Sequence, residues 1–579
     1  MELAGSISRL GRVASGAAPA TLVIRGCTLL STYTGEELPG TDVAVSGDRI
    51  AYVGPDASHA VGPRTTVIDA GGKMAGPGLA DPHTHIDQFA PPAEFAARAL
   101  LRGTTALFSD PVDVTAIGGY RGFAEFARLC AMLPVRVFQT VPGGVPVDPA
   151  MSNCRTMSDM ERRRALGLPG VAGTGEVFAW TKVVAGERGA MRMLGDALRS
   201  GLPVNGHTAG MSGKKLCSYV SSGIFSCHEP IDAAQAIERL RLGMWVMARE
   251  GSIRRDLAAI LSGVLESGVR TDRLMFCTDG VDPGDMSRYG HMDHCMREAV
   301  RLGMGPAHAA ALASTHAFEY YGMGADLGGV APGKLADIVI FGRGLRPETV
   351  IVGGRIAASG GRVLARRGTR RPAPWTRRTV RLGRMSGGAF AAPSGGASAT
   401  AATIKLRTEI ITSMGEAELP VRGGQVVPDG ASKVASFDRI GRTGARTVAF
   451  MEGFGADCAL ASTWCFHEGD LLVIGTDDAD MALAANRVIG AGGGIAVSRG
   501  GRVRAFMPLA LAGVASSRPF DEVAESLAGI NSELRDAGCP LDRPHLVPLF
   551  LEFLALPSVR ILSSGLVDVR GRRYVRPYT

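Results

Sequence analysis

Six side chains have the types, and the order along the chain, that a two-metal hydrolase centre requires. Two of them, His83 and His85, form a His-x-His pair in the segment GPGLADPHTHID. Because residues i and i+2 of a β-strand point to the same face, one short strand can direct both imidazoles at one ion. Histidine and carboxylate ligands suit Zn, Mn or Fe, and the lack of cysteine ligands argues against a closed structural site. The predicted metal ligands are His83, His85, Glu176, His207, His228 and Asp279.

Two carboxylates in this set could do more than hold a metal. Glu176 could bridge two divalent ions, and such a pair of ions would trap a hydroxide that is nucleophilic at neutral pH. Asp279 follows the apolar segment LMFCT, where a carboxylate can bind a metal and also accept the proton of the attacking water. A lone histidine is usually a core or surface residue, but that explanation fits poorly for a His-x-His pair with four further candidates. We therefore expect hydrolytic chemistry.

The elements around these residues indicate how they are brought together. The other four candidates stand at the ends of the apolar segments VAGTGEV, LPVNGH, GIFSCHE and LMFCTD. Between residues 75 and 325, apolar strands alternate with helical segments such as PPAEFAARALLRG, which is amphipathic and ends at Gly103. This alternation predicts an α/β fold with a parallel sheet, and about 250 residues is the usual span of a (β/α)8 barrel. Catalytic groups of such barrels stand at the C-terminal ends of the strands.

Two strand-rich blocks flank the predicted barrel and suggest a small β-sandwich built from both sides of it. The first covers residues 21–72, and the second contains KLADIVIFGRG and ETVIVGGRIAASGGRVL. A further unit of mixed helices and strands follows a connection rich in Gly, Ala and Ser, residues 385–402, which we expect to be flexible. The expected division is 1–74 for the first part of the β-sandwich, 75–325 for the catalytic barrel, 326–365 for the returning part, 366–402 for an Arg-rich and then Gly/Ala/Ser-rich linker, and 403–579 for a C-terminal α+β domain.

Charge and cysteine content limit the remaining function classes. Residues 366–384 hold eight Arg and no acid, which equals the whole net charge of +8, so the rest of the chain is balanced. We read this segment as a solvated linker or surface strand, with an anion-binding or nucleic-acid arm as the alternative. Ten Cys without a C-x-x-C pair suit reduced, buried thiols. With no apolar run long enough to span a bilayer, these features predict a cytoplasmic protein.

The same motifs carry a resemblance to a known family. The order His-x-His, Glu, His, His, Asp resembles the amidohydrolase superfamily. More narrowly, GPGLADPHTHID, GTTALFSDP, GTGEV, VNGHTAGMSGKKLCSYVSSGIFSCHE, MFCTDGVDP and GGVAPGKLADIVI resemble the bacterial adenine deaminases, as do MEGFGA and VIGTDDADMALAANRVIGAGGG near the end of the chain. The resemblance covers about residues 20–579.

The resemblance implies hydrolysis of adenine to hypoxanthine and ammonia, with two divalent ions as cofactors. Manganese or iron is what the family implies, and zinc is what the His-rich ligands alone would allow. Deamination needs an acid that protonates a ring nitrogen, and Glu229, directly after His228, is a candidate for it, with Asp279 as the proton shuttle. The alternative for Glu229 is a carboxylate that stabilises a helix N-terminus. We also expect a homodimer.

Residues expected near the substrate depart from the family pattern. The chain reads Asp87-Gln88-Phe89 where the family usually has Glu-Ser-Ser, and Asp110-Pro111-Val112-Asp113 where it has Asp-Pro-His-Glu. Gly280 follows Asp279 in place of a second acid, Arg439-Ile440 replaces Arg-His, and a run rich in His, Asp and Asn appears as residues 466–470, FHEGD. Candidate substrate-binding residues are Asp87, Asp110, Asp113 and Lys214.

These departures leave two alternatives open besides adenine deamination. The first is an amidohydrolase that acts on another amino-heterocycle or on a cyclic amide. The second, from another class, is a catalytically silent barrel that serves as a scaffold or binding protein, with the Arg-rich segment as its contact. The complete ligand set argues against the second. A small heterocyclic substrate is therefore the expected partner, and neither a membrane nor a nucleic acid is.

Overall fold

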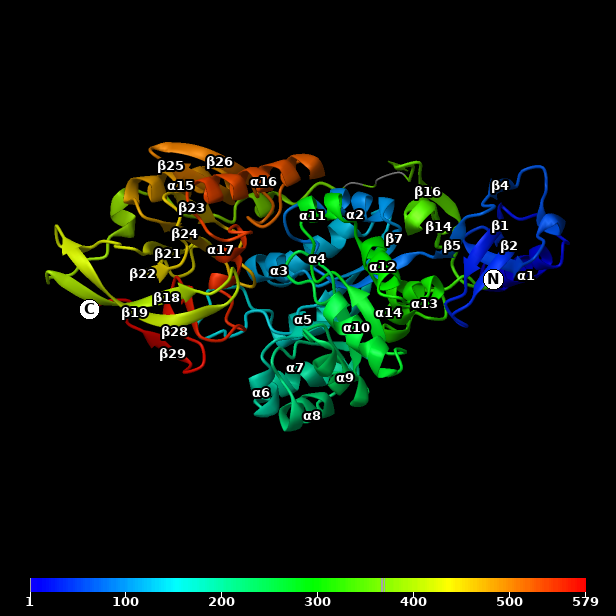
Figure 1. The fold of residues 1–579 in the computed structure, drawn as a ribbon, viewed down its shortest axis with the longest axis horizontal. Helices are drawn as coiled ribbons and strands as arrows, with labels where there is room; N and C mark the ends of the chain where they lie inside the picture. The colour runs from blue at the N-terminus through cyan, green and yellow to red at the C-terminus, as the bar shows by residue number, and fades with distance from the viewer. Residues whose placement is uncertain (1, 366–367, 369) are drawn as a thin grey trace.

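The computed structural model describes residues 2–365, 368 and 370–579, with side chains described from residue 8 onward. The molecule is elongated, with a β-sheet that contains the first strands at one end, a parallel-stranded α/β region in the middle and the C-terminal unit at the other end (Figure 1). None of the helices in the described part of the chain combines the length and the apolar character needed to cross a bilayer. All ten cysteines are free, and only Cys217 is exposed.

Strands from both sides of the central region join in one nine-stranded sheet. Its order is β17-β16-β15-β14-β5-β1-β2-β3, with β4 paired to β1, so β5 and β14 connect the two blocks. The turn after β2 lies against the turn after β15, since a Cβ on Gly354 would meet the Gly47 carbonyl oxygen at 2.0 Å. The sheet therefore curls around one apolar cluster, as expected for a β-sandwich. Its elements are α1 (Glu2–Ala14), β1 (Leu22–Leu30), β2 (Glu37–Ser46), β3 (Arg49–Gly54), η1 (Ser58–Ala60), β4 (Thr66–Asp69), β5 (Met74–Pro77), β14 (Ile338–Phe341), η3 (Arg343–Leu345), β15 (Pro347–Val352), β16 (Arg355–Ser359) and β17 (Arg362–Val363).

The central region contains eight parallel strands in two arcs. One arc has the order β10-β9-β8-β7-β6 and the other β11-β12-β13, and the edges of the two arcs lie side by side at β10/β11 and at β13/β6. The backbone N–H of Asp279, after β13, donates to the carbonyl of His83 on β6 at 3.0 Å. The predicted (β/α)8 order is therefore present. The strands are β6 (Leu79–Thr84), β7 (Thr104–Ser109), β8 (Arg136–Val141), β9 (Val171–Val177), β10 (Val204–Gly206), β11 (Ser226–Cys227), β12 (Trp245–Arg249) and β13 (Leu274–Cys277).

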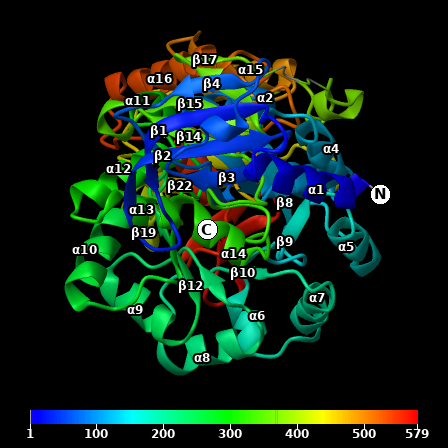
Figure 2. The same cartoon turned by 90° about the vertical axis from the view of Figure 1, so that its right-hand side faces the viewer.

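Helices cover the outside of these strands, and Figure 2 shows them behind and below the curled sheet. Every residue of β6 and β7 is buried, as expected for parallel strands covered on both faces. The helix predicted to stop at Gly103 ends at Leu101, and Gly103 has the positive φ of 76° that a glycine readily adopts there. The helices are α2 (Pro92–Leu101), α3 (Val112–Gly118), α4 (Tyr120–Cys130), α5 (Asp159–Leu166), α6 (Trp180–Val184), α7 (Arg188–Arg199), α8 (Gly213–Ser221), α9 (Ala233–Arg241), α10 (Leu257–Ser267), α11 (Pro283–Arg288), α12 (Met292–Arg301), α13 (Pro306–Ala310), the π-helical η2 (Ala311–Thr315) and α14 (His316–Tyr320).

The segment expected to be a flexible connection is packed instead. Phe390 and Ala392 are completely buried in an apolar cluster of the C-terminal unit, and β18 already begins at Ser398, before the expected boundary at residue 403. Phe390 is a large apolar side chain in a stretch of small residues, and its burial fixes the backbone around it. Upstream, the Thr376 carbonyl accepts from Ala512 N at 2.7 Å. Arg366 and Arg367 of the Arg-rich segment lie outside the described residues.

The C-terminal unit is built on a second nine-stranded sheet with two long helices. The sheet order is β20-β19-β18-β22-β21-β24-β23-β25-β26, and β27-β28-β29 form a separate antiparallel sheet. The unit thus has the α+β composition that the sequence predicts. Its elements are η4 (Pro374–Arg377), η5 (Gly387–Phe390), β18 (Ser398–Leu406), β19 (Thr412–Arg422), β20 (Gln425–Val426), β21 (Ser432–Asp438), β22 (Arg446–Glu452), β23 (Ala459–Ser462), β24 (Asp470–Gly475), α15 (Asp478–Ala491), β25 (Gly494–Arg499), β26 (Arg502–Pro508), α16 (Phe520–Asp536), α17 (Leu546–Leu551), β27 (Val559–Leu562), β28 (Gly565–Asp568) and β29 (Arg573–Val575).

The C-terminal unit packs directly against the ends of the central strands. Phe89, just after β6, donates from its backbone N–H to Val514 at 3.1 Å. The loop between β23 and β24 meets the loop after β8, where Ser152 Oγ donates to Glu468 at 2.5 Å. Arg543 pairs with Asp285 of α11 at 2.8 Å. The C-terminal ends of the strands therefore face another part of the same chain.

Candidate metal centre

Strand β6 and the residue after it present the His-x-His pair. His83 is the fifth residue of β6, and His85 follows its last residue, so both side chains leave the same face of the extended backbone. His85 Nδ1 lies 2.8 Å from the carbonyl oxygen of Asp110. Because a carbonyl only accepts, Nδ1 carries the proton and Nε2 keeps its lone pair free for a metal. Both imidazoles are almost completely buried.

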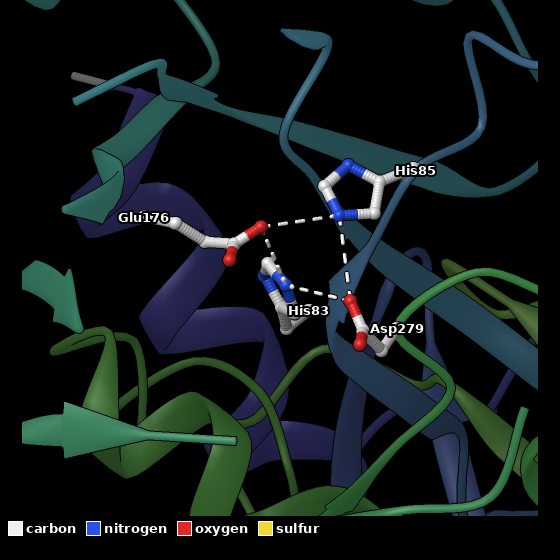
Figure 3. A group of neighbouring side chains, drawn as sticks. All are labelled: His83, His85, Glu176 and Asp279. Atoms are coloured by element: carbon white, nitrogen blue, oxygen red, sulfur yellow. Dashed lines mark ion pairs between the residues drawn. The ribbon is translucent and has the colours of Figure 1, made fainter. Parts of the chain in front are cut away.

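Four side chains converge on one point from β6, β9 and β13 (Figure 3). Glu176 Oε1 lies 3.3 Å from His83 Nε2 and 3.2 Å from His85 Nε2. Asp279 Oδ1 lies 3.2 and 3.4 Å from the same two nitrogens. These four donors lie within 4.8 Å of one another, as ligands of one ion would.

The second oxygen of Glu176 serves a second group. Its Oε2 lies 2.7 Å from His207 Nδ1, at the end of β10, and 3.2 Å from His228 Nε2, after β11. Glu176 therefore divides its carboxylate between two sets of donors, with Oε1 on one side and Oε2 on the other. This is the arrangement of a carboxylate that bridges two ions.

The donor atoms fit a metal better than they fit one another. His83 Nε2, His85 Nε2 and Glu176 Oε1 are buried and have no hydrogen-bond partner among the described residues. Buried polar atoms without partners are costly, and a divalent ion would satisfy all three. Imidazole nitrogens with carboxylate oxygens, and no thiolate, suit Zn, Mn or Fe.

The short distances between the histidines and the carboxylates of this cluster set their pKa values. Burial would lower the pKa of His83, but Glu176 and Asp279 outweigh it and raise that pKa to about 9. Conversely, burial would raise the pKa of Glu176 and of Asp279, whereas the surrounding histidines, His228 foremost, hold both well below the usual range. Both carboxylates are therefore ionised, the state in which they bind metals.

A buried arginine links the two candidate catalytic acids. Arg249, the last residue of β12, is only 3% exposed and contacts Glu229 Oε1 and, at 3.2 Å, Asp279 Oδ2. It also holds Asp256 with Nε and Nη2, at 3.1 and 2.9 Å. Burial would raise the pKa of Glu229, but the Arg249 guanidinium, with His207 and His228, lowers it far below the usual range.

Glu229 is therefore not the helix-stabilising carboxylate of the alternative interpretation. The next helix, α9, begins at Ala233, and Asp232 caps it by accepting from Gln235 N at 2.9 Å. Glu229 instead points toward the second donor group, with its Oε1 3.3 Å from His228 Nε2.

The three expected substrate-binding acids are buried, and each accepts a hydrogen bond from backbone N–H groups. Asp87 Oδ2 accepts from the backbone N–H groups of Asp113 and Val114, both at 3.0 Å, at the start of α3. Asp110 accepts from Glu176 N at 2.8 Å, and Gly175 precedes Glu176 because a Cβ there would lie 2.1 Å from the Asp110 carboxylate. Burial raises the pKa of Asp110 to about 7.

The other two candidates lie in different surroundings. Asp113 is buried, and its Oδ1 accepts from the backbone N–H of His467 at 3.2 Å. Lys214, on α8, is exposed. The structure thus groups the six predicted ligands and Glu229, buries the substrate candidates Asp87, Asp110 and Asp113, and leaves Lys214 at the surface.

A cavity of about 550 Å³ leads to the centre and is lined by both parts of the chain. His207 and Phe178 line it from the central region, and Leu554 and Arg572 line it from the C-terminal unit. Its volume is in the range of small-molecule sites, roughly 300–1,000 Å³.

Sequence reasoning missed Arg249, and it expected residues 466–470 near the substrate only through the family resemblance. The ring of Phe466 lies 5.2 Å from that of His85, edge to face. Arg249 could have been found, because it ends a strand in the same way as the ligands do. Apart from the family resemblance, no local signal identifies Phe466, since its place depends on how two distant segments pack.

Two family profiles match separate parts of the chain. The profile described as "Amidohydrolase family" matches residues 74–357, and that described as "Adenine deaminase C-terminal domain" matches residues 409–573. The first contains all six grouped ligands.

Several curated proteins match over nearly the whole length. A protein of Cenarchaeum symbiosum named adenine deaminase is 56% identical, and the match covers 99% of this chain and 95% of that protein. Proteins with the same name from Moorella thermoacetica and Paracoccus denitrificans are 36% and 35% identical, with 98% and 97% of this chain covered and 97% and 96% of theirs.

Two solved structures that resemble this chain cover somewhat more than half of it. A β-aspartyl dipeptidase from Fervidobacterium islandicum AW-1 is 16% identical, with a TM-score of 0.46, and the match covers 59% of this chain and 97% of that one. An N-acetylglucosamine-6-phosphate deacetylase from Pasteurella multocida is 13% identical, with a TM-score of 0.45, covering 58% of this chain and 100% of that one.

Proposed function

Because this chain belongs to the adenine deaminase family, we propose that it hydrolyses adenine to hypoxanthine and ammonia. It is an amidohydrolase that acts on a C–N bond. In this reaction water adds its oxygen to C6 of the purine ring, and the C6–N bond to the exocyclic amine breaks. The observation that carries the proposal is Glu176, whose two oxygens each serve a separate group of imidazoles.

We propose that two divalent ions occupy the centre. His83, His85 and Asp279 would hold one, His207 and His228 the other, and Glu176 both. Manganese or iron is the family expectation, and zinc suits the same donors. When bound, such ions supply the Lewis acidity that makes water nucleophilic at neutral pH.

The protein's own groups would move the protons. Asp279 is ionised, and its carboxylate lies beside both His83 and His85, so it can accept the proton of the attacking water and return it to the departing amine. Glu229 remains the candidate for protonating a ring nitrogen. Since Arg249 keeps it ionised in the free enzyme, Glu229 would take up its proton only when the heterocycle displaces part of that ion pair.

A second substrate class stays open for one specific reason. Gln88 and Phe89 stand where the family usually has two serines, and Gln88 is buried with its amide nitrogen unpaired among the described residues. Because this hydrogen-bond donor close to the His-x-His pair differs from the family pattern, another amino-heterocycle or a cyclic amide is the second candidate substrate.

An ammonia-release screen tests both substrates. Purified enzyme, loaded with Mn²⁺ and separately with Fe²⁺ and Zn²⁺, is supplied with adenine, guanine, pterins, hydantoins and dihydropyrimidines. Adenine should give the highest kcat/KM. Ammonia from a different amino-heterocycle alone would support the second candidate substrate, and no ammonia from any of them would refute a deaminase.

Two further proposals concern the oligomeric state of the protein and its location in the cell. We propose a homodimer in the cytoplasm, as the sequence suggested. Light scattering on the purified enzyme tests the first, and fractionation of the source cells tests the second.

A further inference from the structure

His467 is a buried histidine for which the framework of the fold offers no partner. It lies in the loop between β23 and β24 of the C-terminal unit, and none of its surface is exposed. Neither Nδ1 nor Nε2 has a hydrogen-bond partner among the described residues. His545, also buried in this unit, differs, because its Nδ1 is paired with Asn531 at 2.8 Å. Two unpaired nitrogens on one buried ring are unusual in a native protein.

The position of the ring relates it to the metal centre. It stacks on Phe553, with 4.9 Å between ring centroids, and meets Phe178 edge to face at 4.3 Å. Phe178 in turn lies 5.4 Å from the ring of His207 and lines the cavity that reaches it. On the other side His467 meets Phe466, whose ring contacts His85. His467 thus stands between two aromatic rings that each contact a metal-ligand candidate.

The backbone holds His467 in a conformation that the chain has to enforce. Its φ is +64°, in the left-handed region that non-glycine residues seldom adopt. Its N–H donates to Asp113 Oδ1, a buried carboxylate at the start of α3, at 3.2 Å. Such strain persists only where the surroundings determine it, and it is frequent at binding sites.

The grouping of donor atoms does not make His467 a further metal ligand. His467 does not belong to any of the groups of donors that lie within 4.8 Å of one another. Burial lowers its pKa well below the usual value, and Glu176 opposes this only in part. The ring is therefore neutral, with one nitrogen that donates and one that accepts.

We propose that His467, supplied by the C-terminal unit, forms one wall of the substrate pocket and makes a hydrogen bond to a ring nitrogen of the heterocycle at the metal centre. This inference rests on the proposed function. A purine offers both acceptor nitrogens and a ring N–H, so either tautomer of His467 finds a partner. Phe178 would pack beside the same ring, because it lies between His467 and His207.

The test compares three variants in the full-length, metal-loaded enzyme. His467→Phe keeps an aromatic ring and removes both nitrogens. His467→Asn tolerates the positive φ but is too short to reach the same position, and it replaces the first variant if that one fails to fold. His545→Asn is the matched control, since it alters another buried histidine of the same unit whose ring contacts Phe89 and Trp464. Metal content and thermal unfolding are measured for each.

We expect both His467 variants to raise KM for adenine, and Kd for hypoxanthine by calorimetry, by roughly 5- to 100-fold, the effect of leaving one buried polar partner unpaired. The metal content should stay at the wild-type value, and kcat should fall less than KM rises. His545→Asn should change neither constant by more than about twofold.

The outcomes separate the two proposals. Wild-type enzyme that neither releases ammonia from adenine nor binds hypoxanthine contradicts the proposed function. Wild-type enzyme that binds hypoxanthine, with His467→Phe and His467→Asn binding it equally well, contradicts this inference alone. Loss of metal in the His467 variants would also overturn it, since it would make His467 part of the metal centre.

Discussion

Replacing Asp279 by Asn tests the core of the mechanism with little change in shape. The carboxylate has two tasks in the structure: Oδ1 lies 3.2 and 3.4 Å from His83 and His85, and Oδ2 lies 3.2 Å from Arg249. An amide can imitate the outline but carries no charge and cannot accept a proton. Loss of one general base costs about 10²–10⁴ in rate, so we expect kcat to fall by at least ~10².

The same variant should fold. Asp279 has a φ of +52°, and Asn is one of the few residues that tolerate this conformation. Arg249 would keep Glu229 and Asp256 as partners after the Oδ2 contact is lost. We therefore expect a soluble protein with near-normal thermal unfolding and the loss of at most one metal ion per chain.

The assay is steady-state ammonia release, with metal analysis of the same sample. Asp285→Asn is the control. Asp285 follows Asp279 closely in the sequence, but it pairs with Arg543 and Arg255, away from the metal-ligand candidates. It should keep nearly the wild-type kcat. An Asp279→Asn enzyme that retains more than about a tenth of wild-type kcat at full metal occupancy would remove Asp279 from the mechanism.

The remaining predictions concern metal content, stability and pH. His83→Ala should lower the metal content by at least one ion per chain by elemental analysis, and wild-type protein grown with Mn²⁺ that holds less than one ion would refute the two-metal proposal. Arg249→Met leaves three carboxylates without their partner and should destabilise the metal-loaded enzyme by about 3–5 kcal/mol in denaturant unfolding. Phe390→Ala should cost about 3–5 kcal/mol in the same assay, whereas a cost near zero would mean that the segment is a loose linker after all. Burial raises the pKa of Glu468 to about 8 from 4.5, so the folded state holds a proton that the unfolded state has lost between these values, and stability falls as pH rises through that window. Glu468→Gln should flatten this fall, and parallel thermal-unfolding curves of the two proteins from pH 5 to 8 would contradict it.

The sequence predicted the parts of the site that depend on local pattern. The His-x-His pair needs only the two-residue period of a strand, and Glu176 and Asp279 each end an apolar segment, so their meeting follows from a parallel sheet. The curled sheet was predictable for the same reason, from alternating strands on both sides of the barrel. Phe390 was misjudged because composition describes an average, whereas one buried aromatic ring decides whether a segment packs.

Contacts between distant segments account for what was missed. Asp110 and Asp113 were predicted to bind substrate, and one oxygen of each accepts from a backbone N–H group, that of Glu176 or that of His467. The other oxygen of each is buried without a partner among the described residues, so substrate binding by these two acids stays a prediction. Neither backbone hydrogen bond has a signature in the neighbouring sequence. The same holds for His467, whose importance depends on the docking of the C-terminal unit.

The six candidate ligands lie far along the chain from the loop between β23 and β24, and this separation affects how the enzyme is assembled during synthesis. All six candidate ligands precede residue 280, whereas Phe466 and His467 emerge from the ribosome later. At roughly 5–20 residues per second, the barrel is complete on the order of ten seconds or more before its mouth is covered. Metal ions can therefore enter an open barrel that cannot yet hold its substrate well. If ions bind as proposed, metal loading and substrate selectivity would be separate, successive events in the synthesis of each chain.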